Sequence, residues 1–112
     1  MRSRDCGEVT RGLVLLIQDD DRLREKAARR LQRLGYLTRT ACCGGDALLQ
    51  LERCEEVPET ILIDLPRSCG AEELVEILRS RFRPESTRVL RLAGDEKPGA
   101  LVRLLDAATS PM

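Results

Sequence analysis

The chain has 112 residues, which is enough for one domain with a single hydrophobic core. Nineteen basic and nineteen acidic side chains balance and only two residues are aromatic, so the chain offers little attraction to phosphates and few rings for stacking bases. No apolar run approaches the ~18 residues of a membrane-spanning helix, and the charged N-terminus lacks a signal-peptide core. We therefore expect a cytoplasmic protein that binds neither nucleic acid nor membrane.

The cysteines and the missing histidine restrict the chemistry. There are five cysteines and no histidine. No pair of cysteines has the two-residue spacing of a zinc or redox motif, so we expect reduced thiols. Because no nucleophile and base arrangement is visible either, we do not expect an enzyme.

The first strand ends in a run of acids. Residues 1–11 mix charges without periodicity and are expected to be a flexible leader before a single domain spanning 12–108, with a tail at 109–112. Within Leu13 to Asp21, a run of apolar residues predicts a strand buried on both faces, and three aspartates follow without a gap. Adjacent carboxylates repel unless water or a cation screens them, which predicts a solvated or metal-accessible edge.

An amphipathic helix and a weak strand follow. Arg22 to Leu34 has apolar residues at helical spacing, with Asp21 as the expected N-cap and Gly35 as the left-handed residue that ends the helix. Its arginine-rich face fits either a solvated surface or a partner surface. Tyr36 to Ala41 alternates weakly, which indicates a short strand near an edge.

A second apolar strand also stops on an acid. After a turn at 42–45, Asp46 is the expected cap of a helix over Ala47 to Cys54. Thr60 to Asp64 is then predicted to be a strand. If it lies parallel to the first strand, Asp64 meets Asp19, Asp20 and Asp21 at the carboxyl end of the sheet, where open α/β sheets bind ligands.

The last elements complete an alternating pattern. A loop at 65–70 precedes a helix over about Ala71 to Arg81, a strand over Arg88 to Leu92 and a final helix over Ala100 to Ala108. Arg91 does not suit a strand covered on both faces, so we expect an edge strand or a poorly covered face. Strands that alternate with helices predict an α/β fold with a parallel sheet and right-handed crossovers.

In this order and spacing, the segments from about Leu13 to Leu92 resemble the receiver domains of two-component response regulators. The resemblance rests on the run ending in Asp19, Asp20 and Asp21, on Leu34-Gly35-Tyr36, on the pattern over Thr40 to Leu48 and on Ile61 to Asp64. It implies a three-layer flavodoxin-like (CheY-like) parallel sheet and a role in signal transduction.

The resemblance also implies a site. Asp64 would accept a phosphoryl group from a histidine kinase in a phosphorelay, and Asp19, Asp20 and Asp64 would hold Mg²⁺ through carboxylate oxygens. Lys97 can be matched to the lysine of the family's Lys-Pro pair.

Three departures from the family weaken that site. Gly70 follows Asp64 by six residues where the family has a glycine after eight, and Ala93 replaces a hydroxyl residue that binds the phosphoryl group. Only about twenty residues follow the strand at 88–92. Two alignments of this end compete. In one, Lys97-Pro98 corresponds to the family's Lys-Pro pair, and the last helix corresponds to its fifth helix. In the other, which we prefer, residues 95–108 correspond to its fourth helix. Both alignments lose the fifth strand and, we expect, the cover on the face bearing Arg91.

Three hypotheses follow. The leading one is a truncated, degenerate receiver (pseudo-receiver) that works by protein-protein interaction, with phosphorylation weakened or lost. An unpaired strand edge would be its contact with a protein partner or a second copy, through Arg88, Leu90, Arg91, Leu101 and Leu104. The second is a working phosphoacceptor that uses Mg²⁺ and Asp64. The third is that the acids only cap helices, as Asp21 and Asp46 would.

Overall fold

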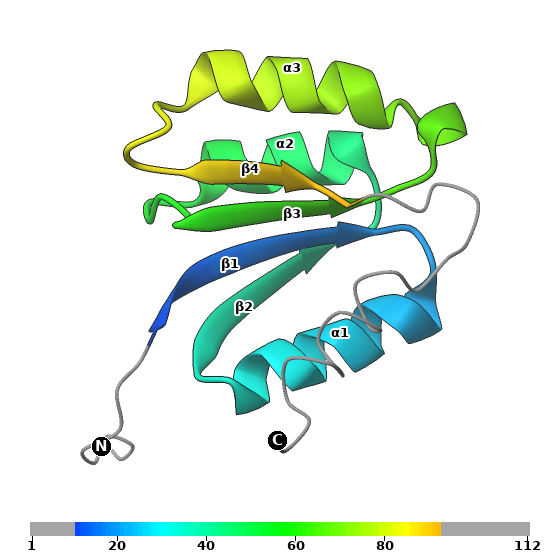
Figure 1. Cartoon of the computed structure of the whole chain (residues 1–112), viewed down its shortest axis with the longest axis vertical. Coiled ribbons are helices and arrows are strands. Elements are labelled where there is room, and N and C mark those ends of the chain that lie inside the picture. The colour runs from blue at the N-terminus through cyan, green and yellow to red at the C-terminus, as the bar shows by residue number, and fades with distance from the viewer. Residues whose placement is uncertain (1–10, 93–112) are drawn as a thin grey trace.

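The computed structural model describes residues 11–92, which form a parallel sheet between two layers of helices (Figure 1). Four strands lie in the order β2-β1-β3-β4 within this range. They are β1 (Arg11–Gln18), β2 (Tyr36–Ala41), β3 (Thr60–Asp64) and β4 (Arg88–Arg91). The helices are α1 (Asp21–Arg33), α2 (Gly44–Arg53) and α3 (Ala71–Arg81), with a short 3-10 turn, η2 (Arg67–Cys69). The expected three-layer, flavodoxin-like fold is confirmed.

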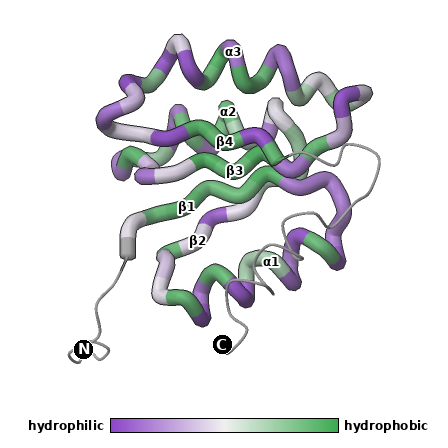
Figure 2. The backbone as a smooth tube through the Cα atoms, viewed as in Figure 1, coloured by the Kyte–Doolittle hydropathy of each residue, from purple (hydrophilic) through white to green (hydrophobic). Residues whose placement is uncertain are grey.

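The core has two halves because the two central strands are buried on both faces. Helix α1 covers one face of the sheet, and α2 and α3 cover the other (Figure 1). Leu15, Ile17 and Ile63 point toward α2 and α3, whereas Val14 and Leu16 point toward α1. Figure 2 shows the resulting apolar stretches along β1 and β3. Each such side chain contributes about 1.5–3 kcal/mol when fully buried, which explains the uninterrupted apolar runs of these strands.

Strand β2 lies at one edge of the described sheet, as its weak alternation predicted. It pairs with β1 alone, and its side chains alternate between half-buried and exposed until Ala41, which is buried. The turn before it contains Gly35, whose φ of 99° is the left-handed backbone expected at the end of α1.

The cap of α1 is Asp20, so the prediction of Asp21 is wrong. Asp20 has extended backbone, and its Oδ1 accepts a hydrogen bond from the Leu23 amide at 3.0 Å. Asp21 is already helical and pairs with Arg24 instead. An N-cap needs non-helical backbone to aim its side chain at the free amides of the first turn, and Asp20 has it whereas Asp21 does not.

Helix α2 begins earlier than predicted, and Cys43 caps it in place of Asp46. The Cys43 sulfur accepts a hydrogen bond from the Asp46 amide at 3.4 Å. The Asp46 carboxylate in turn accepts from the Cys42 amide at 3.2 Å. The two side chains therefore satisfy donors on both sides of the helix start, in the manner of a capping box.

Strand β4 is an edge strand of the described sheet, since within residues 11–92 it pairs only with β3. The expectation that the face bearing Arg91 lacks cover is wrong. The Arg91 side chain is 17% exposed, and its Nη1 lies 3.4 Å from a carboxylate oxygen of Glu72 on α3. Its long stem packs on the covered face while its head reaches the acid. The more open face carries Leu90, which is 42% exposed.

Several expectations fall on residues that the structure does not describe. They are those for Ala93, Lys97, Leu101 and Leu104, the final helix over 100–108, the tail at 109–112 and the leader up to residue 10. Arg11, assigned to the leader, begins β1. Within residues 11–92, no helix has the length and apolar character to cross a bilayer.

Candidate functional site at the acidic end of the sheet

Gln18 and Asp64 face each other at the carboxyl ends of β1 and β3. They are partners in the parallel register of these strands. Both are buried, with 2% and 8% of their surfaces exposed. The Gln18 side-chain amide donates a hydrogen bond of 2.5 Å from Nε2 to Asp64 Oδ2. A buried carboxylate needs such donors, since burial without them disfavours its ionised form.

The oxygen of the same amide is also engaged. Gln18 Oε1 accepts a hydrogen bond from the Asp20 amide at 3.0 Å. These two partners define the orientation of the amide, because the opposite orientation would set its oxygen against a carboxylate and its NH₂ group against an N–H donor. The main-chain carbonyl of Gln18 accepts a third bond, from Arg24 Nη1 at 2.9 Å. Gln18 thus joins the end of β3 to the start of α1.

The three aspartates after β1 share this edge with Asp64 but lie on its solvent side. Asp19, Asp20 and Asp21 are all exposed. One oxygen of Asp20 caps α1, and Asp21 pairs with Arg24. The structure therefore brings the acidic run to the predicted end of the sheet, while a neutral amide occupies the position beside Asp64.

The described residues do not form an assembled magnesium site. Within residues 11–92, no group of three or more His, Cys, Asp or Glu side chains is placed to hold a metal. Mg²⁺ requires near-octahedral oxygen ligands and binds protein through one or two carboxylates. Here Asp64 Oδ2 faces an N–H donor, and the Gln18 oxygen faces a backbone amide.

The segment after Asp64 is more ordered than the predicted loop. Leu65 is buried, and Pro66 leads into the 3-10 turn η2. Gly70 follows with a φ of 77° and is the N-cap of α3, without a side chain to contribute. Because that backbone is left-handed, only glycine adopts it without strain, and the six-residue segment turns directly from β3 into α3.

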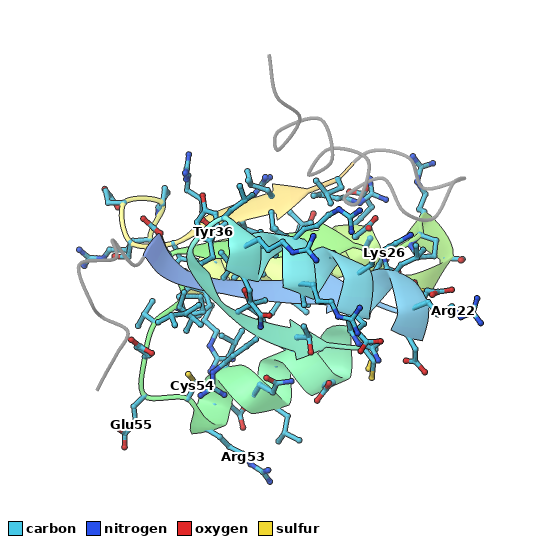
Figure 3. The ribbon with its side chains drawn as sticks, turned by 90° about the horizontal axis from the view of Figure 1, so that it is seen from below. Arg22, Lys26, Tyr36, Arg53, Cys54 and Glu55 are labelled. Carbon is cyan, nitrogen blue, oxygen red and sulfur yellow. The ribbon has the colours of Figure 1, made fainter. Side chains whose placement is uncertain are left out.

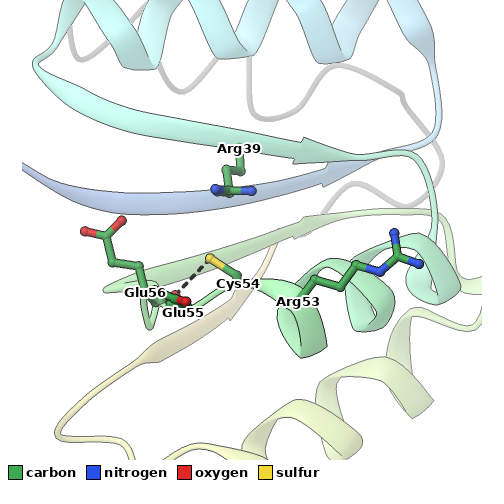
Figure 4. Close-up of a pocket in the computed structure, with 5 residues that line it drawn as sticks. All are labelled: Arg39, Arg53, Cys54, Glu55 and Glu56. Atoms are coloured by element: carbon green, nitrogen blue, oxygen red, sulfur yellow. Dashed lines mark hydrogen bonds between the residues drawn. The ribbon is translucent and has the colours of Figure 1, made fainter.

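A separate pocket of about 580 Å³ lies at the other end of the sheet, beside β2 and the end of α2 (Figure 4). Arg39, Arg53, Cys54, Glu55 and Glu56 line it. The Cys54 thiol donates to the Glu56 carbonyl at 3.1 Å, while the Arg53 guanidinium points away from Cys54 (Figure 4). Figure 3 also shows Arg53 and Glu55 projecting away from the ribbon. These groups do not converge on a common point, so the pocket carries no catalytic arrangement.

Sequence reasoning missed Gln18 as a site residue. The available signal was a polar side chain inside a strand predicted to be buried on both faces. Buried polar groups are almost always hydrogen-bonded, so such a residue has to find a partner at the strand end. Its partner is 46 positions away in the sequence, and only the strand register reveals it.

Comparisons with solved structures agree with this topology. A CheY-like receiver domain from Methylobacillus flagellatus matches with a TM-score of 0.62 and 22% identity, covering 79% of this chain and 76% of that one. The chemotaxis response regulator CheY4 of Vibrio cholerae matches with a TM-score of 0.61 and 21% identity, covering 88% of this chain and 98% of that one. The beryllofluoride-activated DrrB receiver domain matches with a TM-score of 0.56 and 24% identity, covering 76% of this chain and 69% of that one. No protein-family model and no curated protein matches the sequence. The chain thus has the CheY-like fold of response-regulator receiver domains.

Proposed function

We propose that this chain is a receiver-like signalling module of the cytoplasm that acts by binding another protein, and that phosphoryl acceptance at Asp64 is lost. The contact between Gln18 and Asp64 carries this proposal. Phosphoryl transfer to a carboxylate requires a free attacking oxygen and a cation that offsets the charge of the phosphoryl group. Gln18 engages one oxygen of Asp64 and, being neutral, adds no charge to attract a divalent cation.

The proposed interaction surface is the edge at β4. Its described members are Arg88, Leu90 and Arg91, while Leu101 and Leu104 remain expectations for residues beyond the described range. Two features support this surface. β4 pairs with only one strand in residues 11–92, and Leu90 is exposed there. Unpaired strand edges are a common route to association with another chain.

The alternative is a working phosphoacceptor of a two-component phosphorelay, with a histidine kinase as its partner. It would use Mg²⁺ held by Asp19, Asp20 and Asp64, with Lys97 as a further contact. One observation favours it, because Asp64 ends β3 at the same edge as the exposed acids. This alternative requires the Gln18 amide to leave Asp64 Oδ2.

Amide NMR of the full chain distinguishes the two functions. We would add Mg²⁺ and then beryllofluoride to the wild type, to Gln18→Asp and to Gln32→Asp. Gln32 is exposed on α1, so its variant adds the same charge away from the site. We expect a local response to Mg²⁺ only in Gln18→Asp. Shifts of the wild type at Asp19, Asp20 and Asp64 that grow with beryllofluoride would establish the phosphoacceptor and overturn the proposal.

A further inference from the structure

Within residues 11–92, the backbone of β4 presents two residues to the edge that pairs with no other strand. The Arg88 amide donates to the Glu59 carbonyl and the Leu92 amide to the Ile63 carbonyl, each at 2.9 Å. These residues therefore face β3. Since successive residues of a strand turn their backbone groups to opposite sides, Val89 and Arg91 direct theirs away from the sheet.

A guanidinium from α3 covers part of that edge. Arg79 donates a hydrogen bond of 3.1 Å from Nη2 to the Val89 carbonyl. A charged side chain over an edge carbonyl is one way in which proteins prevent unwanted strand pairing. The cover is a single hydrogen bond from an exposed helical residue, so an incoming strand can replace it.

A groove of about 270 Å³ opens beside this carbonyl. Its described lining consists of the cations Arg79 and Arg88, the apolar Phe82, Pro84, Val89 and Leu90, and the polar Thr87. None of the described residues that line it is acidic. A lining that combines apolar side chains with two positive charges is complementary to a segment that carries both apolar and acidic side chains.

We propose that this groove binds an extended segment of a partner protein in which apolar and acidic side chains alternate, and which adds to β4 as a further strand. This rests on the proposed function, because it specifies the partner of that interaction surface. A backbone N–H of the segment would take the place of Arg79 at the Val89 carbonyl. The released guanidinium would pair with a carboxylate of the segment, and an apolar side chain would enter the groove beside Leu90.

A second copy of the chain fits this surface less well than an acidic segment. Pairing two β4 edges would bring Arg79 and Arg88 of both copies to one interface. No acid balances them among the groove's lining residues in the described range 11–92, and like charges across an interface oppose association. Charge therefore favours a foreign acidic partner.

The test uses two synthetic peptides and the full isotope-labelled chain. One peptide alternates glutamate and valine, and the other alternates lysine and valine. We expect the acidic peptide to shift the amide signals of Arg79, Phe82, Val89 and Leu90, and the basic peptide to leave them unchanged. Arg79→Glu should weaken binding of the acidic peptide at least tenfold. Lys26→Glu on α1 makes the same change in charge away from the groove (Figure 3) and should leave binding unchanged.

Three outcomes would overturn the proposal. They are no shift at these amides, an equal response to both peptides, or unchanged binding by Arg79→Glu. Shifts of the same amides that grow with protein concentration in the absence of peptide would assign the edge to a second copy instead. Because the Mg²⁺ and beryllofluoride titration reports on the Asp64 end, its outcome separates failure of this proposal from failure of the proposed function.

Discussion

The buried amide of Gln18 donates a hydrogen bond of 2.5 Å to the carboxylate of Asp64 across the parallel ends of β1 and β3. A hydrogen bond to a charged group contributes about 1.5–3 kcal/mol to stability, more than a neutral one. The same amide accepts the Asp20 N–H. Gln18 thus performs a structural task, because it couples the end of β3 to the start of α1.

Replacing Gln18 by leucine should destabilise the fold. The substitution removes a donor from Asp64 and the acceptor of the Asp20 amide, so we expect the free energy of unfolding to fall by about 1–3 kcal/mol. Urea denaturation followed by circular dichroism measures this change. Gln32→Leu alters an exposed residue of α1 and should change stability by less than about 0.5 kcal/mol. Equal losses in the two variants would show that the contact is unimportant for stability.

Much of the fold could be predicted from local patterns. β3 and α3 have the bounds that their apolar spacing indicates. β1 was recognisable because a continuous apolar run suits a strand covered on both faces. The helix caps were less predictable. Three consecutive aspartates are all suitable cap residues, and the one that caps is decided by backbone dihedral angles, which put Asp20 in that role.

The site was only partly predictable because its main contact is non-local. The sequence indicates that Asp64 and the acidic run share an edge, but not that Gln18 lies between them. Arg91 illustrates the same limit. Its position suggested an uncovered face, whereas an acid on α3 and the length of its own stem allow it to be largely buried. In both contacts, Gln18 with Asp64 and Arg91 with Glu72, the two residues lie far apart in the sequence.

Removing the cap of α1 should have a measurable cost. Asp20→Ala deletes the acceptor of the Leu23 amide, and loss of an N-cap costs about 0.5–2 kcal/mol. Asp21→Ala removes only an exposed ion pair with Arg24, and exposed pairs are worth about 0.2–1 kcal/mol. Thermal and urea unfolding of both variants would compare them. A larger loss for Asp21→Ala would contradict the assignment of the cap.

Two glycines offer a matched test of backbone strain. Gly70 has a φ of 77°, and alanine there adopts the left-handed region at a cost of about 1–2 kcal/mol. Gly45 lies in α2, and a Cβ atom built on it meets nothing within 4 Å. Gly45→Ala should therefore stabilise the chain by up to about 1 kcal/mol, because alanine favours helix. Unfolding midpoints that move in the same direction in both variants would contradict this account.

The adjacent thiols of Cys42 and Cys43 should differ from an isolated thiol in their reactivity. The pKa of the exposed Cys42 thiol is raised. The largest cause is a hydrogen bond with the Cys43 side chain, and the second is the charge of Cys43. The thiolate is the nucleophile, so a raised pKa leaves less of it at a given pH and slows alkylation. At pH 8 we expect iodoacetamide to modify Cys42 more slowly than the exposed Cys69, as followed by peptide mass spectrometry. Cys43→Ala removes both causes and should accelerate modification of Cys42. Alkylation of Cys42 at the rate of Cys69 in the unmodified sequence would show that the pair does not interact.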